Sequence, residues 1–192
     1  MAIAGYAEES KVTGAILSDH QFSHACNMAA AAGLDSRVNF HLRDYREQTG
    51  HFDKVVSVGL LEYVGPQGYA NYFLKIRALL ADYRIAVIHT IGMQHKAGPV
   101  NRWITKYIFP GGYLPSIGQM NRHTEKCGLN VLDMEVMRGH YAETLRLWRI
   151  RFLDHRAAMR RLYDACFVRM WEFYLVGCEY FSRRQHVTVL QL

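Results

Sequence analysis

The sequence predicts an α/β fold in which helices cover both faces of a largely parallel sheet. Short β-branched runs alternate with segments of helical spacing along most of the 192 residues, and this alternation calls for parallel strands joined by helical crossovers. Ionisable residues also recur where the apolar runs end, above all in residues 52–119. Because open α/β sheets bind ligands at the carboxyl ends of their strands, we expect part of a site in that stretch.

The strands are predicted from β-branched and aliphatic runs bounded by turn residues. In chain order these runs read KVTGAIL, RVNFHL, KVVSV, YRIAVIHT, LNVLDMEVM and HVTVLQL. The last of them can run antiparallel at the edge of the sheet, as is common in mixed sheets. The corresponding residues are 11–17, 37–42, 54–58, 83–90, 129–137 and 186–192.

The helices are predicted from their spacing and from their start and stop signals. Ser18 followed by Gln21 has the pattern of a capping box, so a helix should begin there and stop at Gly33. Residues 103–109 are aromatic, and they are helical or irregular up to the Pro-Gly-Gly turn that follows. The other expected helices are residues 1–9, 69–80, 116–127 and 141–180, the last with a break near 161–164.

Length and composition predict one domain over residues 1–192 with an ordinary globular core. No apolar run reaches the roughly 20 residues that span a bilayer, and the first residues lack the basic and apolar regions of a signal peptide. The four cysteines are scattered without a CxxC pair, which favours free thiols in a reducing compartment.

The net charge of +6 suits an anionic partner, either nucleic acid or an anionic membrane. Two interpretations of the basic C-terminal third stay open: a solvated helix face whose apolar stripe lies in the core, or a face that meets lipid headgroups. Nucleic-acid binding is disfavoured because the basic residues lie on an apolar-striped helix with no recognition motif. These residues are Arg146, Arg149, Arg151, Arg156, Arg160, Arg161, Arg169, Arg183 and Arg184.

Glu62 and His89 are the first candidates for a functional site. Glu62 follows a strand in GLLEYVG, where a carboxylate could orient a ligand or accept a proton; alone, it is better interpreted as a solvated loop glutamate. His89 ends the strand in VIHTIG and is either a hydrogen-bonded core histidine or a catalytic group. Tyr141 opens a helix in GHYAETLRLW, where the alternative to a functional phenol is simple packing.

Asp44 and Tyr45 end the second strand, where an acid and an aromatic ring could hydrogen bond to and stack on an adenine. A polar turn is the alternative, because Asp is common in turns. His20 and His24 have the i, i+4 spacing of metal ligands, with Cys26 nearby, but no third ligand has a convincing spacing, so we expect no metal. GxGxxG, P-loop and GxSxG motifs are absent from the sequence.

Taken together, these segments resemble the cyclopropane-fatty-acyl-phospholipid synthase family and the related mycolic acid cyclopropane synthases. The resemblance covers essentially the whole chain, and its most specific segments are HTIG, KYIFPGGYLPS and HYAETLRLW, in that order. Other segments that carry it are VTGAILSDHQ, DYR, FDKVVSVGLLEYVG and FVRMWEFYLVGCE.

The resemblance implies a class I S-adenosylmethionine-dependent methyltransferase fold, with a Rossmann-like sheet and helices on both faces. It implies methylene transfer to cis double bonds of phospholipid acyl chains, with bound bicarbonate removing a proton from the new methyl group. The bicarbonate ligands carry over to Glu62, His89, the Ile91 backbone and Tyr141. The S-adenosylmethionine contacts carry over to Leu17, Ser18, Gln21, Asp44 and Tyr45.

The same resemblance implies a cytoplasmic enzyme that associates peripherally with the inner face of a phospholipid membrane carrying unsaturated acyl chains, and it leaves a homodimer open. A methyltransferase of the same family acting on another lipid or a small amine is one alternative. A non-catalytic membrane-binding module is another, since the basic C-terminal helices could bind lipid without turnover.

Three departures from the family pattern stand out. Tyr63 replaces a histidine after Glu62, and Ile16 replaces a threonine before Leu17. The family also has a central strand, a glycine-rich loop and a bicarbonate-binding cysteine upstream of the segment that begins here. We therefore expect a truncated domain that lacks this strand and loop. Unpaired neighbouring strands cost about 1–3 kcal/mol per buried backbone group, so we expect such a chain to be poorly stable and to bind the cofactor weakly.

Overall fold

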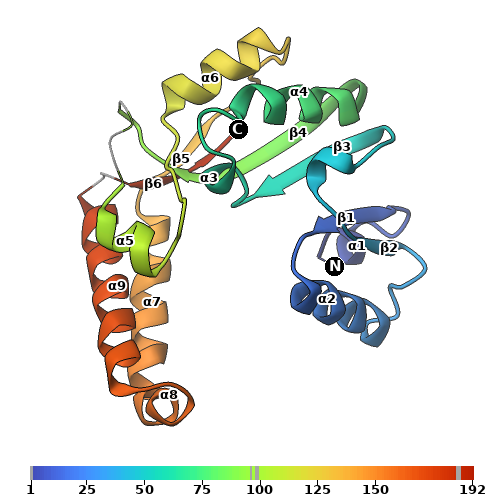
Figure 1. Ribbon diagram of the computed structural model, residues 1–192. Helices are drawn as coiled ribbons and strands as arrows, with labels where there is room; N and C mark the ends of the chain where they lie inside the picture. Colours follow the sequence, from blue (N-terminus) through green and yellow to red (C-terminus); the bar gives the residue numbers. More distant parts are fainter. Residues whose placement is uncertain (1, 96, 98–99, 185–186) are drawn as a thin grey trace. The chain divides into compact units, whose positions relative to one another are not determined.

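The computed structural model describes residues 2–95, 97, 100–184 and 187–192, and the chain forms two compact units (Figure 1). Unit 1 is Met1–His51 and unit 2 is Phe52–Leu192. Each has its own sheet, of two strands in unit 1 and four in unit 2. The expectation of a single domain over the whole chain stays a prediction.

Unit 1 is a small α/β unit around two parallel strands. Its elements are α1 (Ala2–Tyr6), β1 (Val12–Ile16), α2 (Asp19–Ala31), β2 (Val38–Leu42) and the 3-10 turn η1 (Tyr45–Glu47). The expected cap of α2 is present, because Ser18 Oγ accepts a hydrogen bond from the Gln21 N–H at 3.4 Å. The chain leaves the helix through Gly33, whose φ of 65° suits glycine.

Unit 2 contains a mixed sheet with the strand order β3-β4-β6-β5. β3 and β4 are parallel, whereas β6 is antiparallel to both β4 and β5. The strands are β3 (Phe52–Val58), β4 (Leu80–Gly92), β5 (Glu135–Met137) and β6 (Thr188–Gln191).

The structure corrects two expectations about these strands. The terminal strand is antiparallel as expected, but it lies between β4 and β5 and not at the edge; His186, where we expected it to begin, lies outside the described residues. β5 covers three residues of the expected nine, because Asp133 Oδ1 accepts from the Met134 N–H at 2.8 Å and this local bond competes with strand pairing.

The helices of unit 2 form two groups. α4 and α6 pack together beside the sheet, and Tyr69, Phe73 and Met120 are fully buried there. α7 and α9 form an antiparallel pair that runs away from the sheet and is joined by α8 (Figure 1). The helices are α3 (Leu61–Val64), α4 (Tyr69–Leu79), α5 (Arg102–Tyr107), α6 (Ile117–Lys126), α7 (His140–Asp154), α8 (Arg156–Leu162) and α9 (Ala165–Arg183).

The long C-terminal helical segment is interrupted twice, not once. The expected break lies at Tyr163 and Asp164, where the Asp164 carboxylate caps α9 by accepting from the Phe167 N–H at 2.6 Å. A second break at His155 separates α7 from α8. Within the described part of the chain, no helix combines the length and apolar character needed to cross a bilayer.

Candidate active site

Glu62 is buried at the carboxyl end of the unit 2 sheet. β3 ends at Val58, Gly59 turns the chain with a φ of 64°, and α3 then carries Glu62 back over the strand ends. The Glu62 side chain is buried, and its Oε1 accepts a hydrogen bond from the Ile91 N–H of β4 at 2.7 Å. These contacts exclude the interpretation of Glu62 as a solvated loop residue.

The second oxygen of this carboxylate is unusual. Glu62 Oε2 is buried and has no hydrogen-bond partner among the described residues. A buried acceptor without a donor costs roughly 1–3 kcal/mol, and more when it is charged, so this oxygen is placed to receive a proton or a hydrogen bond from a ligand. The Ile91 N–H, which the resemblance assigns to bicarbonate, is used by Glu62 here.

His89 lies on β4, two residues before Ile91. Because side chains alternate along a strand, His89 and Ile91 share one face of β4. The His89 carbonyl accepts from the Gly59 N–H at 2.9 Å, which ties the end of β3 to β4. The ring Nδ1 of His89 is buried and, among the described residues, has no hydrogen-bond partner. A second unsatisfied polar atom therefore lies at the same end of the sheet.

Tyr141 enters this region from the first turn of α7. It is half-buried against the apolar cluster of the α7–α9 pair, which includes Leu145, Val168 and Tyr174. Burial raises the pKa of the Tyr141 phenol, a hydrogen bond from Tyr174 opposes this effect, and the nearby Glu62 carboxylate adds to the rise in pKa. Tyr141 therefore stays neutral and lies within electrostatic reach of Glu62.

Tyr141 and Tyr174 interact through their phenols. Burial raises the pKa of both, and their hydrogen-bond interaction lowers the pKa of Tyr141 and raises that of Tyr174. Tyr174 is itself buried among Phe109 and Trp171, with ring centroids at 5.9 Å and 5.1 Å. Both phenols therefore stay neutral.

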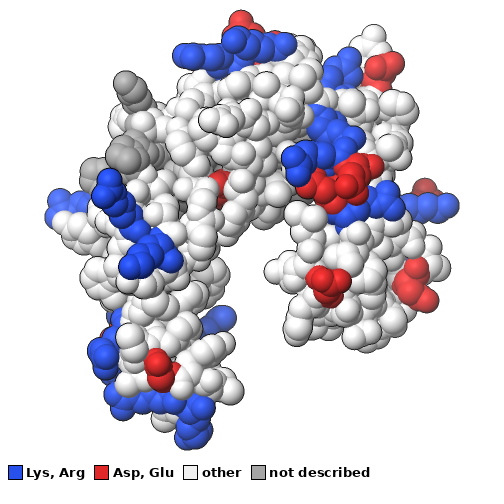
Figure 2. Space-filling model, viewed as in Figure 1, with Lys and Arg blue, Asp and Glu red and all other residues white. Residues whose placement is uncertain are grey.

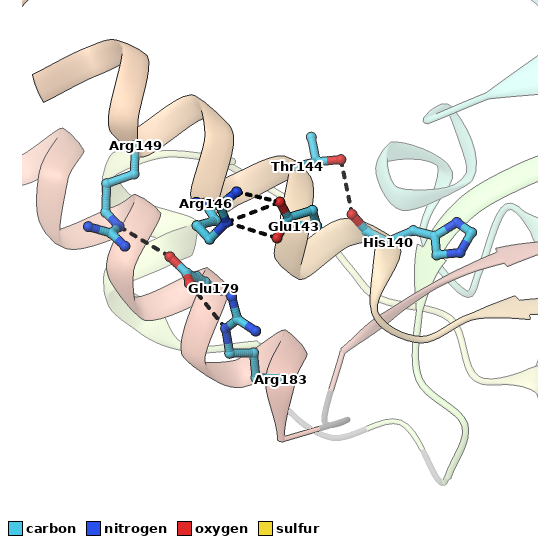
Figure 3. Close-up of polar contacts among 7 residues, drawn as sticks. All are labelled: His140, Glu143, Thr144, Arg146, Arg149, Glu179 and Arg183. Atoms are coloured by element: carbon cyan, nitrogen blue, oxygen red, sulfur yellow. Dashed lines mark hydrogen bonds and ion pairs between the residues drawn. The ribbon is translucent and has the colours of Figure 1, made fainter. Parts of the chain in front are cut away.

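An ion pair joins α7, the helix that carries Tyr141, to α9 (Figure 3). Glu179 of α9 binds Arg149 of α7 at 3.1 Å and Arg183 of its own helix at 2.9 Å. Burial alone would raise the pKa of Glu179, but hydrogen bonds from Arg183 and Arg149 outweigh it and lower that pKa. The carboxylate is therefore charged at neutral pH and joins the two helices.

Three residues around Glu62 and Tyr141 were not predicted from the sequence. Tyr69 is fully buried, burial raises the pKa of its phenol, and Tyr113 and Glu62 add to this rise. The Tyr113 N–H donates to the Glu62 carbonyl at 2.9 Å, and Tyr174 binds Tyr141. The helical spacing that places Tyr69 and Tyr174 in a core was visible, but the proximity of Tyr69 to Glu62 and of Tyr174 to Tyr141 depends on packing between distant segments.

The five expected cofactor contacts all lie in unit 1, at the carboxyl ends of β1 and β2. The parallel register pairs Ile16 with Leu42, and the Arg43 N–H donates to the Ile16 carbonyl at 3.0 Å. The segments that follow the two strands are thus neighbours. They carry Leu17, Ser18 and Gln21 on one side and Asp44 and Tyr45 on the other.

These residues fit S-adenosylmethionine in part. Leu17 is 68% exposed, and Ser18 and Gln21 are also exposed, so this side of the edge is accessible to a ligand. Hydrogen bonds from Arg46 hold the pKa of Asp44 below its usual range, so the carboxylate is charged and can accept from a hydroxyl. Both of its oxygens already bind Arg46, at 2.9 and 2.7 Å, which leaves only their remaining lone pairs for a ligand.

His20 and His24 do not form a metal site with Cys26. They line an open depression on α2 together with Asp19, Ser23 and Asn27. Among the described residues, no group of three or more His, Cys, Asp or Glu side chains is arranged to hold a metal ion.

Comparison with known proteins shows the family of the chain. The family model for mycolic acid cyclopropane synthetase matches residues 1–192. The chain is 39% identical over 200 residues to tuberculostearic acid methyltransferase UfaA1 of Mycobacterium tuberculosis, with 100% of this chain and 46% of the relative covered. It is 36% identical over 160 residues to the cyclopropane-fatty-acyl-phospholipid synthase of Escherichia coli, with 83% and 41% covered.

Solved structures show the same fold. The mycolic acid cyclopropane synthase CmaA1 complexed with SAH and CTAB superposes with a TM-score of 0.90 at 24% identity, covering 99% of this chain and 72% of that one. The predicted α/β, S-adenosylmethionine-dependent methyltransferase fold is thereby confirmed. The chain spans less than half the length of the two relatives named above.

Proposed function

Because the chain belongs to the mycolic acid cyclopropane synthetase family, we propose that it transfers a methylene group from S-adenosylmethionine to cis double bonds of phospholipid acyl chains. The products are cyclopropane fatty acyl groups. The observation that carries the proposal is the pair of buried, unsatisfied polar atoms at the end of the sheet, Glu62 Oε2 and His89 Nδ1. They are two of the groups that this chemistry would need around a small anion.

The proposed site would hold bicarbonate. A small anion in a water-poor pocket must have its lone pairs satisfied. His89 and the Tyr141 hydroxyl can donate to it, and Glu62 Oε2 can accept its hydroxyl proton. The basic oxygens of the anion then face the substrate. The neutral tyrosines around Glu62 support this assignment, since burial raises the pKa values of both Tyr69 and Tyr141.

The reaction balances with these groups. S-adenosylmethionine, when bound, would supply the methyl group to one alkene carbon, with the carbon–sulfur bond breaking and the positive charge passing to the other alkene carbon. Glu62, His89 and Tyr141 would hold the anion as the base for one proton of the new methyl group, and the electron pair left behind would close the ring. The aromatic and apolar residues around Tyr141 exclude water that would otherwise capture the cation.

The proposal is tested by incubating the chain with S-adenosylmethionine and vesicles of a cis-unsaturated phospholipid. Mass spectrometry should show the gain of one CH₂ per modified acyl chain, and proton NMR should show loss of the alkene with appearance of ring protons. Unchanged lipid under conditions in which the chain is folded would refute the proposed function for this chain.

A second candidate is transfer of a methyl group to one alkene carbon followed by loss of a proton, which gives a branched lipid that keeps one double bond. The observation that favours it is the 39% identity with a relative named tuberculostearic acid methyltransferase. The same experiment separates the two candidates, because a product with one added carbon and no cyclopropane ring protons would support methyl branching.

A further inference from the structure

One helix face in unit 2 exposes aromatic and apolar side chains to solvent. On α9, Phe173, Val176 and Tyr180 are 62%, 47% and 54% exposed. Their spacing of three and four residues places them on one side of the helix. α5 lies beside this stripe, because Trp103 packs edge-on against Phe173 with ring centroids at 4.9 Å. We call this surface the α5–α9 face; it also includes Tyr107, which is 49% exposed.

Cations surround this stripe. Lys106 lies 5.0 Å from the Tyr107 ring centroid, and Arg184 lies 5.2 Å from that of Tyr180. Arg169 is exposed one helical turn before Phe173, and Arg102 is exposed at the start of α5. Figure 2 shows Lys and Arg side chains over α5 and around the α8 end of the helix pair, with uncharged surface between them.

The acidic residues of these helices do not cancel this charge. α5 contains none. The two glutamates of α9 are each engaged by arginines, Glu172 with Arg156 at 3.3 Å and Glu179 with Arg149 and Arg183. The α5–α9 face therefore combines exposed aromatic area with uncompensated positive charge.

A bilayer interface matches this combination better than a protein surface. Aromatic side chains prefer the headgroup level of membranes, and long basic side chains reach from an apolar surface to anionic lipids. Exposed apolar stripes of this kind mark sites of interaction. The face adjoins the apolar cluster of Tyr141 and Tyr174, since Trp103 and Phe109 both pack against that cluster.

We propose that the α5–α9 face docks on an anionic phospholipid bilayer. Phe173, Val176 and Tyr180 enter the headgroup region, and Lys106, Arg169 and Arg184 bind lipid phosphates. The inference deepens the proposed function by naming the surface through which the lipid substrate is approached. The biological purpose of docking rests on the proposed function, but docking itself needs neither the cofactor nor a double bond in the lipid.

The test is co-sedimentation of the full chain with vesicles of diphytanoyl lipids, whose chains have no double bond, in the absence of S-adenosylmethionine. Vesicles with equal parts of phosphatidylcholine and phosphatidylglycerol should bind the chain, and pure phosphatidylcholine vesicles should bind it much more weakly. Arg169→Glu should weaken binding roughly 30-fold. Each basic residue near an anionic surface contributes about 1 kcal/mol, and replacing Arg by Glu changes the charge by two units. Val176→Glu should also weaken binding.

Matched controls are available in the same unit. Leu74 of α4 is 52% exposed, close to Val176, and Arg122 of α6 is exposed like Arg169. Leu74→Glu and Arg122→Glu make the same chemical changes away from the α5–α9 face and should leave binding within a few-fold of the wild-type chain. Circular dichroism melts of all four variants distinguish lost docking from lost folding.

Several outcomes would overturn the proposal. One is equal binding by the Val176→Glu variant and the wild-type chain; another is an equal loss in the Leu74→Glu control. A change in elution volume on size-exclusion chromatography caused by Val176→Glu would instead identify the face as an interface between copies. Retention of single-stranded DNA with no vesicle binding would identify a nucleic-acid surface. A chain that binds vesicles as expected but transfers no methylene would refute the proposed function alone.

Discussion

Replacing Glu62 by glutamine separates the chemical role of this residue from its structural role. The carboxylate is 8% exposed, and its Oε1 accepts from the Ile91 N–H at 2.7 Å. Glutamine has almost the same shape, and its carbonyl can keep this hydrogen bond. It cannot accept a proton, and its NH₂ group would replace Oε2, which is buried and unpaired among the described residues.

The expected magnitudes differ between stability and activity. Replacing a charge-assisted hydrogen bond by a neutral one costs about 1 kcal/mol, and burying an unpaired NH₂ costs about 1–3 kcal/mol. Removing a buried charge acts in the opposite direction. The net change in the free energy of unfolding should therefore stay near 2 kcal/mol or less, a shift of about 2–4 °C in Tm per kcal/mol. Turnover should fall by about 10²–10⁴-fold, as for loss of a general acid–base group.

The assay measures methylene transfer to cis-unsaturated phospholipid and the thermal melt of the same preparation. Glu125→Gln is the matched control, because Glu125 is an exposed glutamate on α6 in the same unit. It should change neither quantity. A Glu62→Gln variant that is folded and keeps turnover within a few-fold of the wild-type chain would refute the assigned role.

Three further predictions concern the surroundings of the site. Tyr174→Phe removes the hydroxyl whose interaction lowers the pKa of Tyr141, so this pKa should rise further in an ultraviolet phenol titration and kcat should fall about tenfold with little change in KM. Glu179→Gln should lower the free energy of unfolding by about 1 kcal/mol at neutral pH. Because the folded-state pKa of Glu179 is depressed, this stabilisation is present above the ordinary glutamate pKa and is lost as the pH falls through the folded-state pKa. The free energies of unfolding of the two proteins, measured in urea, should therefore converge at acidic pH. Gly92→Ala places a Cβ 2.7 Å from a backbone carbonyl oxygen and should destabilise the chain by about 1–3 kcal/mol. Gly177→Ala meets no atom within 4 Å of its new Cβ and should stabilise α9 by about 0.5–1 kcal/mol. Equal melting temperatures of the two variants would contradict this prediction.

The sequence predicted those features that depend on local chemistry. The cap at Ser18, the turn at Gly33 and the helix break near residues 161–164 follow from side-chain hydrogen bonds or backbone freedom within a few residues. Strand order was not predictable in the same way. β6 has the alternating pattern of an edge strand, yet it lies between β4 and β5, because its pairing partners are about 100 and 50 residues away in the chain.

In the candidate site, too, local features could be predicted from the sequence and features that depend on packing could not. The position of Glu62 after a strand was visible, but its burial was not, because this burial depends on α3 folding back onto β4 and on the Ile91 N–H. The role of Tyr174 could not be predicted from its own segment, since the bond to Tyr141 forms only when α9 packs on α7. Residue types indicated the chemistry, and packing between distant segments decided which atoms meet.

The most direct test of the anion site is the bicarbonate dependence of turnover. The wild-type chain is incubated with S-adenosylmethionine and cis-unsaturated phospholipid vesicles in buffer freed of carbon dioxide, with bicarbonate then added back. If Glu62, His89 and Tyr141 hold this anion as the base, cyclopropane product should be low at first and should rise severalfold on addition. Full turnover in bicarbonate-free buffer, with no response to added bicarbonate, would contradict the assignment.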